Sequence, residues 1–292
     1  MRMAVIVPFL NEEMYLGTLL ESIGHQARMP DQLLLVDDGS NDGSLAVAEQ
    51  FAGERSWAHV VARPRRSQER DRLATAAELV AFTWGVEQLE PGWDVVGKLD
   101  ADLRLTPACF AEIEKQLEAD PQLGLAGAYL SIISEDGRPV RERCPPDHVR
   151  GATKFYRRQC FADVFPLPPA LGWDTVDEVK ARMHGWRTAS FAIPGGDPIH
   201  LRPTASYDGA LRGFVRSGVG TYAYGAHPLW MVLSGLRRVH HAPPVIGSLA
   251  YFAGWTRAAV RRIPRADPSV RRYVRREQTA RMRAVLRPSR MP

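Results

Sequence analysis

The sequence contains few cysteines, and their spacing is not that of a metal site. Cys109, Cys144 and Cys160 are the three cysteines among 292 residues, and no Cys-x-x-Cys pair occurs. Zinc sites and disulfide frameworks use closely spaced or evenly numbered cysteines, so the sequence indicates neither of them. We therefore expect the protein to work in a reducing compartment.

Long apolar runs are absent as well. No stretch approaches the roughly 20 apolar residues that a helix needs to cross a bilayer. The apolar run at the amino terminus is short, has the length of a strand, and meets Glu12 and Glu13 at once, which is unlike a signal peptide. These absences predict a cytoplasmic location.

Acidic residues are scarce at the carboxyl terminus. Residues 256–292 hold twelve arginines against Asp267 and Glu277, a net charge of +10, whereas the whole chain carries +5. The tail lacks the interleaved aromatic residues of a base-stacking surface, so no nucleic-acid partner is expected. The other residues therefore carry a net charge of −5, and such a basic tail indicates an anionic membrane surface as a neighbour.

The remaining composition is that of a globular α/β protein. With 45% hydrophobic and 24% charged residues, the chain is ordinary for a soluble protein and long enough to bury a core. Strand-like segments alternate with segments of helical periodicity, and Asp136-Gly137 predicts a hairpin turn, after which we expect a mixed sheet. The predicted strands cover residues 4–10, 33–36, 58–62, 94–99, 123–133 and 191–193, and the predicted helices cover 13–23, 45–51, 73–89 and 106–117.

Acidic and polar residues follow three of these strands. The pairs are Asn11-Glu12, Asp37-Asp38 and Asp100/Asp102, the last separated by one residue. Two carboxylates at that spacing on a strand end can share a hard dication such as Mg²⁺ or Mn²⁺, which leaves positions for water and phosphate. Because the carboxyl ends of parallel strands form nucleotide pockets, the pattern predicts a metal-dependent nucleotide site.

Three motifs together resemble glycosyltransferase family 2. They are Val7-Pro8-Phe9-Leu10-Asn11-Glu12, Val36-Asp37-Asp38-Gly39-Ser40-Asn41-Asp42 and Leu99-Asp100-Ala101-Asp102. The resemblance is strong to about residue 105, moderate to about 205 and thin beyond. It implies the GT-A fold, an α/β (Rossmann-like) domain with a mixed, mainly parallel sheet flanked by helices. We expect this catalytic domain at residues 1–220 and a helical, arginine-rich appendage at 221–292.

The resemblance also implies an activity and a set of site residues. Members of the family move a sugar from a nucleotide-diphosphate donor, linked to UDP or GDP, to a hydroxyl acceptor with inversion at the anomeric carbon. The implied metal ligands are Asp100 and Asp102, with His200 as a third candidate, and the cofactor is Mg²⁺ or Mn²⁺. The implied nucleotide contacts are Pro8, Asn11, Glu12, Asp37, Asp38 and Asp100, and Arg65 and Arg202 are candidates for the diphosphate.

Two aspartates are candidates for the catalytic base that deprotonates the acceptor. Many members of the family show a Glu-Asp pair where this sequence has Val176-Asp177, so alignment on Gly172-Trp173 favours Asp177. Asp174 directly follows Trp173, and we place it in the loop before a helix, where a carboxylate can point into a cleft. Asp174 is slightly preferred, and Asp177 is retained.

The carboxyl-terminal region suggests a membrane interface. Residues 222–233 and 245–255 are short apolar stretches with aromatic residues bordered by arginines, and the tail has a partial apolar stripe. Such segments suit helices that lie in a bilayer surface; the alternative is a helical pair docked on the catalytic domain. The stripe comprises Val270, Tyr273, Val274, Met282 and Val285. This interpretation favours a lipid-linked or glycan acceptor, a role in cell-surface or exopolysaccharide synthesis, and peripheral attachment to the inner face of the cell membrane.

Two other classes of function compete with this interpretation. A nucleotidyltransferase would share the sheet and the metal acids, but it would carry a glycine-rich loop after the first strand, where this chain has Pro8-Phe9-Leu10-Asn11-Glu12. A membrane-surface adaptor on a degenerate transferase fold would explain the tail, but not the intact acids at Asp100 and Asp102.

Overall fold

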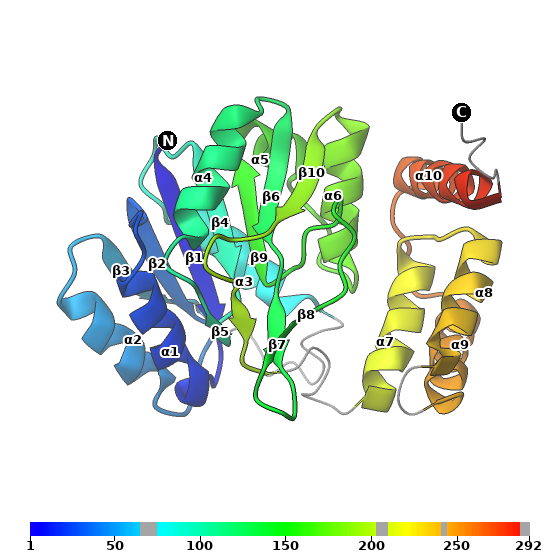
Figure 1. Ribbon diagram of the computed structural model, residues 1–292, viewed down its shortest axis with the longest axis horizontal. Coiled ribbons are helices and arrows are strands. Elements are labelled where there is room, and N and C mark those ends of the chain that lie inside the picture. The colour runs from blue at the N-terminus through cyan, green and yellow to red at the C-terminus, as the bar shows by residue number, and fades with distance from the viewer. Residues whose placement is uncertain (65–74, 203–209, 241–243, 287–292) are drawn as a thin grey trace. The chain divides into compact units, whose positions relative to one another are not determined.

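The computed structural model describes residues 1–64, 75–202, 210–240 and 244–286 (Figure 1). The chain divides into two compact units. The first comprises Met1–Pro169 and His184–Pro203, and the second comprises Ala170–Met183 and Thr204–Pro292. The boundary expected after residue 220 falls inside a helix, α7 (Ala210–Ala223), whereas the units divide after Pro203.

Within the described residues, the first unit is built on a seven-stranded sheet in the order β10-β6-β9-β4-β1-β2-β3. Neighbouring strands are parallel except β9, which is antiparallel to both β4 and β6. The strands are β1 (Met3–Phe9), β2 (Gln32–Asp37), β3 (Ala58–Ala62), β4 (Val95–Leu99), β6 (Leu123–Ala128), β9 (Thr153–Arg157) and β10 (Arg187–Phe191). The expected mixed, mainly parallel sheet is thus confirmed.

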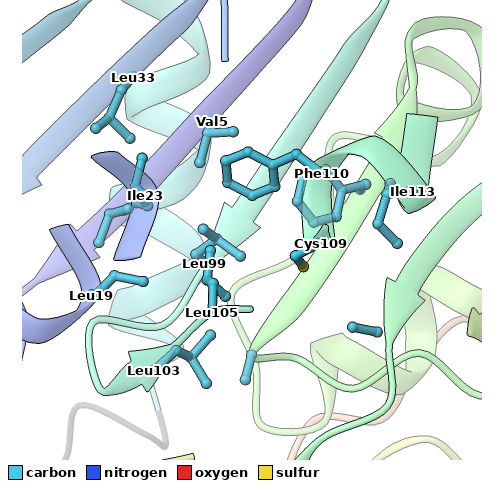
Figure 2. Packing of buried hydrophobic residues seen from close by; sticks show 14 of the residues in the cluster. Val5, Leu19, Ile23, Leu33, Leu99, Leu103, Leu105, Cys109, Phe110 and Ile113 are labelled. Atoms are coloured by element: carbon cyan, nitrogen blue, oxygen red, sulfur yellow. The ribbon is translucent and has the colours of Figure 1, made fainter. Parts of the chain in front are cut away.

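Helices cover both faces of this sheet, as the alternation of buried side chains along β1 requires. Val5 and Val7 point into the larger cluster with α1 (Glu13–Gly24), α2 (Ser44–Gly53) and α4 (Cys109–Ala119). Figure 2 shows part of this packing, with Phe110 of α4 between Val5 and Ile113 in the view. Ile6 points to the opposite face, which α3 (Ala77–Glu87) and α5 (Arg158–Val164) cover.

A smaller sheet holds the segments that follow β4 and β10. Its order is β5-β11-β7-β8, and its strands are β5 (Leu103–Arg104), β7 (Ser131–Ile133), β8 (Pro139–Arg141) and β11 (Ile199–His200). The predicted hairpin at Asp136-Gly137 joins β7 to β8, and Gly137 has the positive φ of +79° that the turn needs.

Three predicted elements have other bounds than expected. The single strand over 123–133 is two strands, β6 and β7, which belong to different sheets. The helix predicted over 73–89 begins at Ala77, because Ala76 has a left-handed backbone, and residues 73 and 74 lie outside the described part. The strand predicted at 191–193 is the end of β10, which stops at Phe191.

The second unit is helical. It contains α6 (Trp173–Met183), α7, α8 (Pro228–Arg237), α9 (Ile246–Val260) and α10 (Pro268–Leu286). A Cβ added at Gly218 of α7 would lie 2.0 Å from the carbonyl oxygen of Tyr251, and one at Gly254 of α9 would lie 2.1 Å from that of Val215. Glycine at these two positions therefore lets the backbones of α7 and α9 approach closely. Among the described helices, none is both long and apolar enough to span a membrane.

The apolar stripe of the tail is used in packing within this unit. Val270 and Val274 of α10 are buried against Val179 of α6, and the hydroxyl of Tyr273 donates to the carbonyl of Arg182 over 3.3 Å. This corrects the expectation that the stripe faces a bilayer, because these side chains are covered by the protein itself. The side chain of Val285 lies outside the described part.

Candidate active site

The acids predicted to form one site do follow adjacent strands. β4, β1 and β2 are neighbours and run parallel, so the segments after them leave the sheet at the same edge. A proline is tolerated at position 8 because this part of β1 has a neighbouring strand on one side only. β1 pairs with β4 as far as Ile6, and beyond that point it pairs with β2 alone. This edge is where open α/β sheets bind ligands.

Asp100, Asp102 and His200 form a cluster. One ligand atom from each lies within 4.8 Å of the others, and His200 Nε2 is 3.3 Å from Asp102 Oδ1. The small sheet explains the approach, because His200 on β11 pairs with Leu103, and the Leu201 amide donates to the Asp102 carbonyl over 2.8 Å. A histidine distant in sequence is thereby held beside the Asp-x-Asp motif.

These donor groups fit a divalent cation. Two carboxylates and an imidazole nitrogen suit Mn²⁺, and the carboxylates alone suit Mg²⁺, with the remaining positions open to water or phosphate. Burial lowers the pKa of His200, but the hydrogen bond to Asp102 and the charges of Asp102 and Asp100 raise it by more, so that the pKa lies above its usual value. The neutral ring, which is the form that can coordinate a metal, therefore predominates only at a higher pH than for an ordinary histidine.

Arg202 joins Asp102 to Glu12. Its Nε donates to Asp102 Oδ2 over 3.0 Å, and one terminal nitrogen donates to Glu12 Oε1 over 2.7 Å. The other oxygen of Glu12, Oε2, is buried and has no hydrogen-bond partner within the described part of the chain. Burial raises the pKa of Glu12, the charges of Asp102 and Asp100 raise it further, and Arg202 opposes the rise. Arg202 thus lies at the Asp102 carboxylate and links it to Glu12.

Lys98 is a charged residue of the site that sequence reasoning missed. Its side chain is 1% exposed, pairs with Asp100 and Glu78, and donates to the carbonyl of Gly151 over 2.9 Å. Lysine is almost never fully buried without a partner. A lysine inside the apolar run of β4, two residues before Asp100, was a usable signal, but its partner Glu78 comes from α3 and could not be found from spacing.

The loops after β1 and β2 are joined by hydrogen bonds. Asn11 has a φ of +55°, its amide donates to Ser40 Oγ over 3.1 Å, and its Oδ1 accepts from the Asn41 amide over 2.9 Å. The Glu12 amide donates to Ser44 Oγ over 2.7 Å. No side-chain hydrogen bond from its own N-cap residue caps α1, and the hydroxyl of Ser44, the first residue of α2, satisfies the amide of that N-cap residue, Glu12.

Asp37 and Asp38 have different surroundings. Asp37 Oδ1 accepts from the Ser40 amide over 2.9 Å, which fixes the turn after β2. Asp38 is 1% exposed and accepts from Arg63 Nε over 2.6 Å. Arg63 lies just after β3 and was not predicted as a site residue. Asp38 and Arg63 thus form an ion pair at the same edge of the sheet.

The candidates for the base lie on α6. Asp174 is in the first turn of this helix, so its expected place in the preceding loop is wrong. Asp174 is partly exposed, whereas Asp177 is fully buried and its Oδ1 accepts from the Glu178 amide over 2.7 Å. Both belong to the second unit and the metal cluster belongs to the first. Arg65, the other candidate for the diphosphate, lies outside the described residues.

The chain is similar to known proteins in both sequence and structure. The family model for glycosyl transferase family 2 matches residues 4–168, more than half of the chain. It therefore covers the motifs at Asn11, Asp38 and Asp102, and it ends before α6 and His200. Among curated proteins, polyprenol monophosphomannose synthase of Mycolicibacterium smegmatis is 29% identical over 130 residues, which are 44% of this chain and 46% of that protein. The match thus spans less than half of this relative.

Solved structures share the fold at low sequence identity. Mannosyltransferase PcManGT from Pyrobaculum calidifontis, solved in complex with GDP-Man and Mn²⁺, has a TM-score of 0.57 at 18% identity; the match covers 98% of this chain and 80% of that one. Residues 1–349 of TarS from S. aureus have a TM-score of 0.53 at 18% identity, with coverage of 88% and 71%. At these identities the likeness supports the fold alone.

Proposed function

The chain belongs to glycosyl transferase family 2, and from this premise we propose that it moves a sugar from a nucleotide-diphosphate donor to a hydroxyl acceptor with inversion at the anomeric carbon. The observation that carries the proposal is the cluster of Asp100, Asp102 and His200 at the carboxyl edge of a mainly parallel sheet. A site with these ligands binds a diphosphate through its metal, which is what the leaving group of such a reaction requires.

We assign the metal to Asp100, Asp102 and His200, with Mn²⁺ and Mg²⁺ both suited to the two carboxylates. When bound, the cation would stabilise the negative charge that develops on the leaving diphosphate. Arg202 holds Asp102 in place and would add a second positive charge beside the diphosphate. The presence of Mn²⁺ in the complex of the mannosyltransferase from Pyrobaculum calidifontis supports a metal in this proposal.

The nucleotide is proposed to lie over the ends of β1 and β2. Asp38 and Arg63 offer an acceptor and a donor to a base, and Pro8 and the joined loops around Asn11 form the adjoining wall. Uracil and guanine both present an N–H beside a carbonyl, so this pair suits UDP as well as GDP. Asp37 has a role in the turn itself, and we propose it as a support of the site.

For the catalytic base we propose Asp174, with Asp177 as the alternative. A base must reach the acceptor hydroxyl, and the partial exposure of Asp174 supports it over the buried Asp177. The acceptor is proposed to be a glycan or a lipid-linked molecule of the cell surface, with the protein attached to the inner face of an anionic membrane. The exposed arginines of α10 support that partner; they are Arg272, Arg276, Arg281 and Arg283.

The proposal is tested by the products made from nucleotide sugars. The full chain is incubated with GDP-mannose or UDP-N-acetylglucosamine and Mn²⁺, with and without membrane extract as acceptor, and the released nucleotide is identified. Release of GDP or UDP that depends on the metal and increases with the extract supports the proposal. In a separate reaction with a nucleoside triphosphate and a sugar 1-phosphate, release of pyrophosphate would instead indicate a nucleotidyltransferase. No turnover together with no nucleotide binding would indicate an adaptor.

A further inference from the structure

One end of the helical unit carries a group of exposed aliphatic side chains, which we name the apolar end. They come from the start of α7, the last turn of α8, and the first turns of α9 with the residue before it. They are Leu211 (45% exposed), Leu233 (38%), Leu236 (54%), Val245 (52%), Ile246 (52%) and Leu249 (62%).

The directions of the three helices bring these side chains together. α7 and α9 run parallel, because Phe214 packs on Gly247 near their starts and Tyr222 contacts Trp255 further along, with ring centroids 5.7 Å apart. The end of α8 meets the start of α9, since Ser248 Oγ donates to the carbonyl of Gly235 over 2.8 Å and the Val245 amide donates to the carbonyl of Val239 over 3.0 Å. The starts of α7 and α9 and the end of α8 therefore lie at one end of the unit (Figure 1).

The closest contacts between the helices of the unit are made by other residues. The contacts between α7, α8 and α9 use other positions, such as the fully buried Tyr251 and the glycines at 218, 235 and 254. A soluble protein seldom exposes several large aliphatic side chains next to one another unless they bind something. The apolar end is therefore a candidate binding surface.

The charge around the apolar end points to an anionic partner. Residues 209–266 contain eight arginines and no aspartate or glutamate. Arg212 and Arg237 are exposed and directly follow Leu211 and Leu236. Arg238 is held at the same end, where its guanidinium lies 4.5 Å from the ring centre of Tyr251 and donates to Ser217 Oγ over 3.0 Å. Aliphatic side chains bordered by arginines fit the boundary between acyl chains and anionic headgroups.

We propose that the apolar end inserts into the surface of an anionic lipid bilayer, with Leu236, Ile246 and Leu249 among the upper acyl chains and Arg237 at the headgroups. This inference deepens the membrane partner of the proposed function by naming the surface that meets the lipid. It rests on that partner and not on the catalytic assignment. It also moves the contact away from α10, from its exposed arginines as well as its buried stripe. α10 packs at the other end of the unit, where the Ala266 amide donates to the carbonyl of Ala223 and Gln278 accepts from the His227 amide.

The test compares two matched sets of variants of the full chain. Leu236→Ser/Ile246→Ser removes two aliphatic side chains from the apolar end, whereas Val260→Ser removes one at the opposite end of α9 that is 77% exposed. Binding is measured by flotation with vesicles of phosphatidylcholine alone and with vesicles rich in phosphatidylglycerol. Metal-dependent binding of GDP or UDP is measured in parallel, so that a failure of the catalytic assignment is seen separately.

We expect the wild type to bind the anionic vesicles and the double variant to bind them at least about ten-fold more weakly. Val260→Ser should bind like the wild type. Arg237→Gln should bind the anionic vesicles a few-fold more weakly than the wild type at low salt, and this difference should disappear at high salt. If the double variant unfolds, Val245→Ser/Leu249→Ser serves the same purpose at the same end.

Two results would overturn the proposal. One is equal binding of anionic vesicles by the wild type and a folded variant of the apolar end, or no binding by either. The other is a dimer of the wild type that the double variant loses without any change in vesicle binding, which would assign the apolar end to a second copy of the chain.

Discussion

Lys98→Met tests the electrostatic account of the metal cluster most strictly, because it changes stability and metal affinity in opposite directions. The Lys98 ammonium is 1% exposed and pairs with Asp100 and Glu78, whose side chains are 26% and 39% exposed. Methionine has a similar length and no charge, so the substitution leaves both carboxylates without this partner.

The loss of stability follows from the burial of the three groups. Removal of one partner from a fully buried ion pair costs about 3–5 kcal/mol. Because Asp100 and Glu78 keep access to solvent that screens their charges, we expect the free energy of unfolding of the metal-free protein to fall by a smaller amount, about 1–3 kcal/mol. Lys115→Met, at a lysine that is 70% exposed, is the control and should change stability by less than about 0.5 kcal/mol.

The effect on metal binding has the opposite sign. A dication held by Asp100 would lie within about 5 Å of the Lys98 ammonium, where their repulsion is roughly 1.5–3.5 kcal/mol at effective dielectric constants of about 40–80. The lost hydrogen bond that orients Asp100 opposes this gain by about 0.5–1.5 kcal/mol. The repulsion is larger, so Mn²⁺ should bind Lys98→Met about ten-fold more tightly than it binds the wild type.

Chemical unfolding of the metal-free proteins and calorimetric titration with Mn²⁺ measure the two quantities. The reasoning is refuted if Lys98→Met is as stable as the wild type, or if it binds Mn²⁺ more weakly while remaining folded. In the second case the orientation of Asp100, and not the charge of Lys98, would dominate the site.

The remaining predictions concern the metal ligand, the helix crossing and the base. In a calorimetric titration with Mn²⁺, binding by the wild type should weaken as pH falls from about 8 to 6, because His200 has a raised pKa and its protonated ring cannot coordinate a metal. His200→Asn should bind Mn²⁺ more weakly than the wild type at about pH 8, and its affinity should change less with pH. Gly218→Ala should lower the free energy of unfolding by about 1–3 kcal/mol, since the added Cβ would lie 2.0 Å from a carbonyl oxygen. Gly220→Ala in the same helix is the control: its Cβ would meet no atom within 4 Å, so the better helix propensity of alanine should raise the free energy of unfolding by up to about 1 kcal/mol. Asp174→Asn should lower kcat at least about 100-fold with nucleotide binding retained, and Asp177→Asn should act chiefly on stability; the reverse order of kcat values would make Asp177 the base.

The sequence was sufficient for the parts of the site that local pattern determines. The spacing of Asp100 and Asp102 after an apolar run predicted their position at the end of β4, and the alternation of strands and helices predicted the class of the sheet. His200 was named from the family resemblance, and the structure brings it to Asp102 through the pairing of β11 with β5. A two-residue pairing of this kind leaves no periodic signal.

Other contacts could not be predicted because they join distant segments. Glu78 reaches Lys98 from α3, Arg63 reaches Asp38 from the end of β3, and Ser44 at the start of α2 accepts from the amide before α1. The stripe of α10 was correctly identified as apolar, but an apolar stripe does not reveal its partner. Here Val274 packs on α6, whereas Leu236 and its neighbours at the apolar end are exposed.

The central claim is that Asp100, Asp102 and His200 hold a metal that binds the diphosphate of a nucleotide donor. The most direct test is calorimetric titration of the full chain with GDP and UDP, each with and without Mn²⁺, for the wild type and for Asp102→Asn. The account predicts that the wild type binds at least one of the two nucleotides only when Mn²⁺ is present, and that Asp102→Asn binds neither while remaining folded. Binding that is independent of Mn²⁺, or that is unchanged in Asp102→Asn, would contradict it.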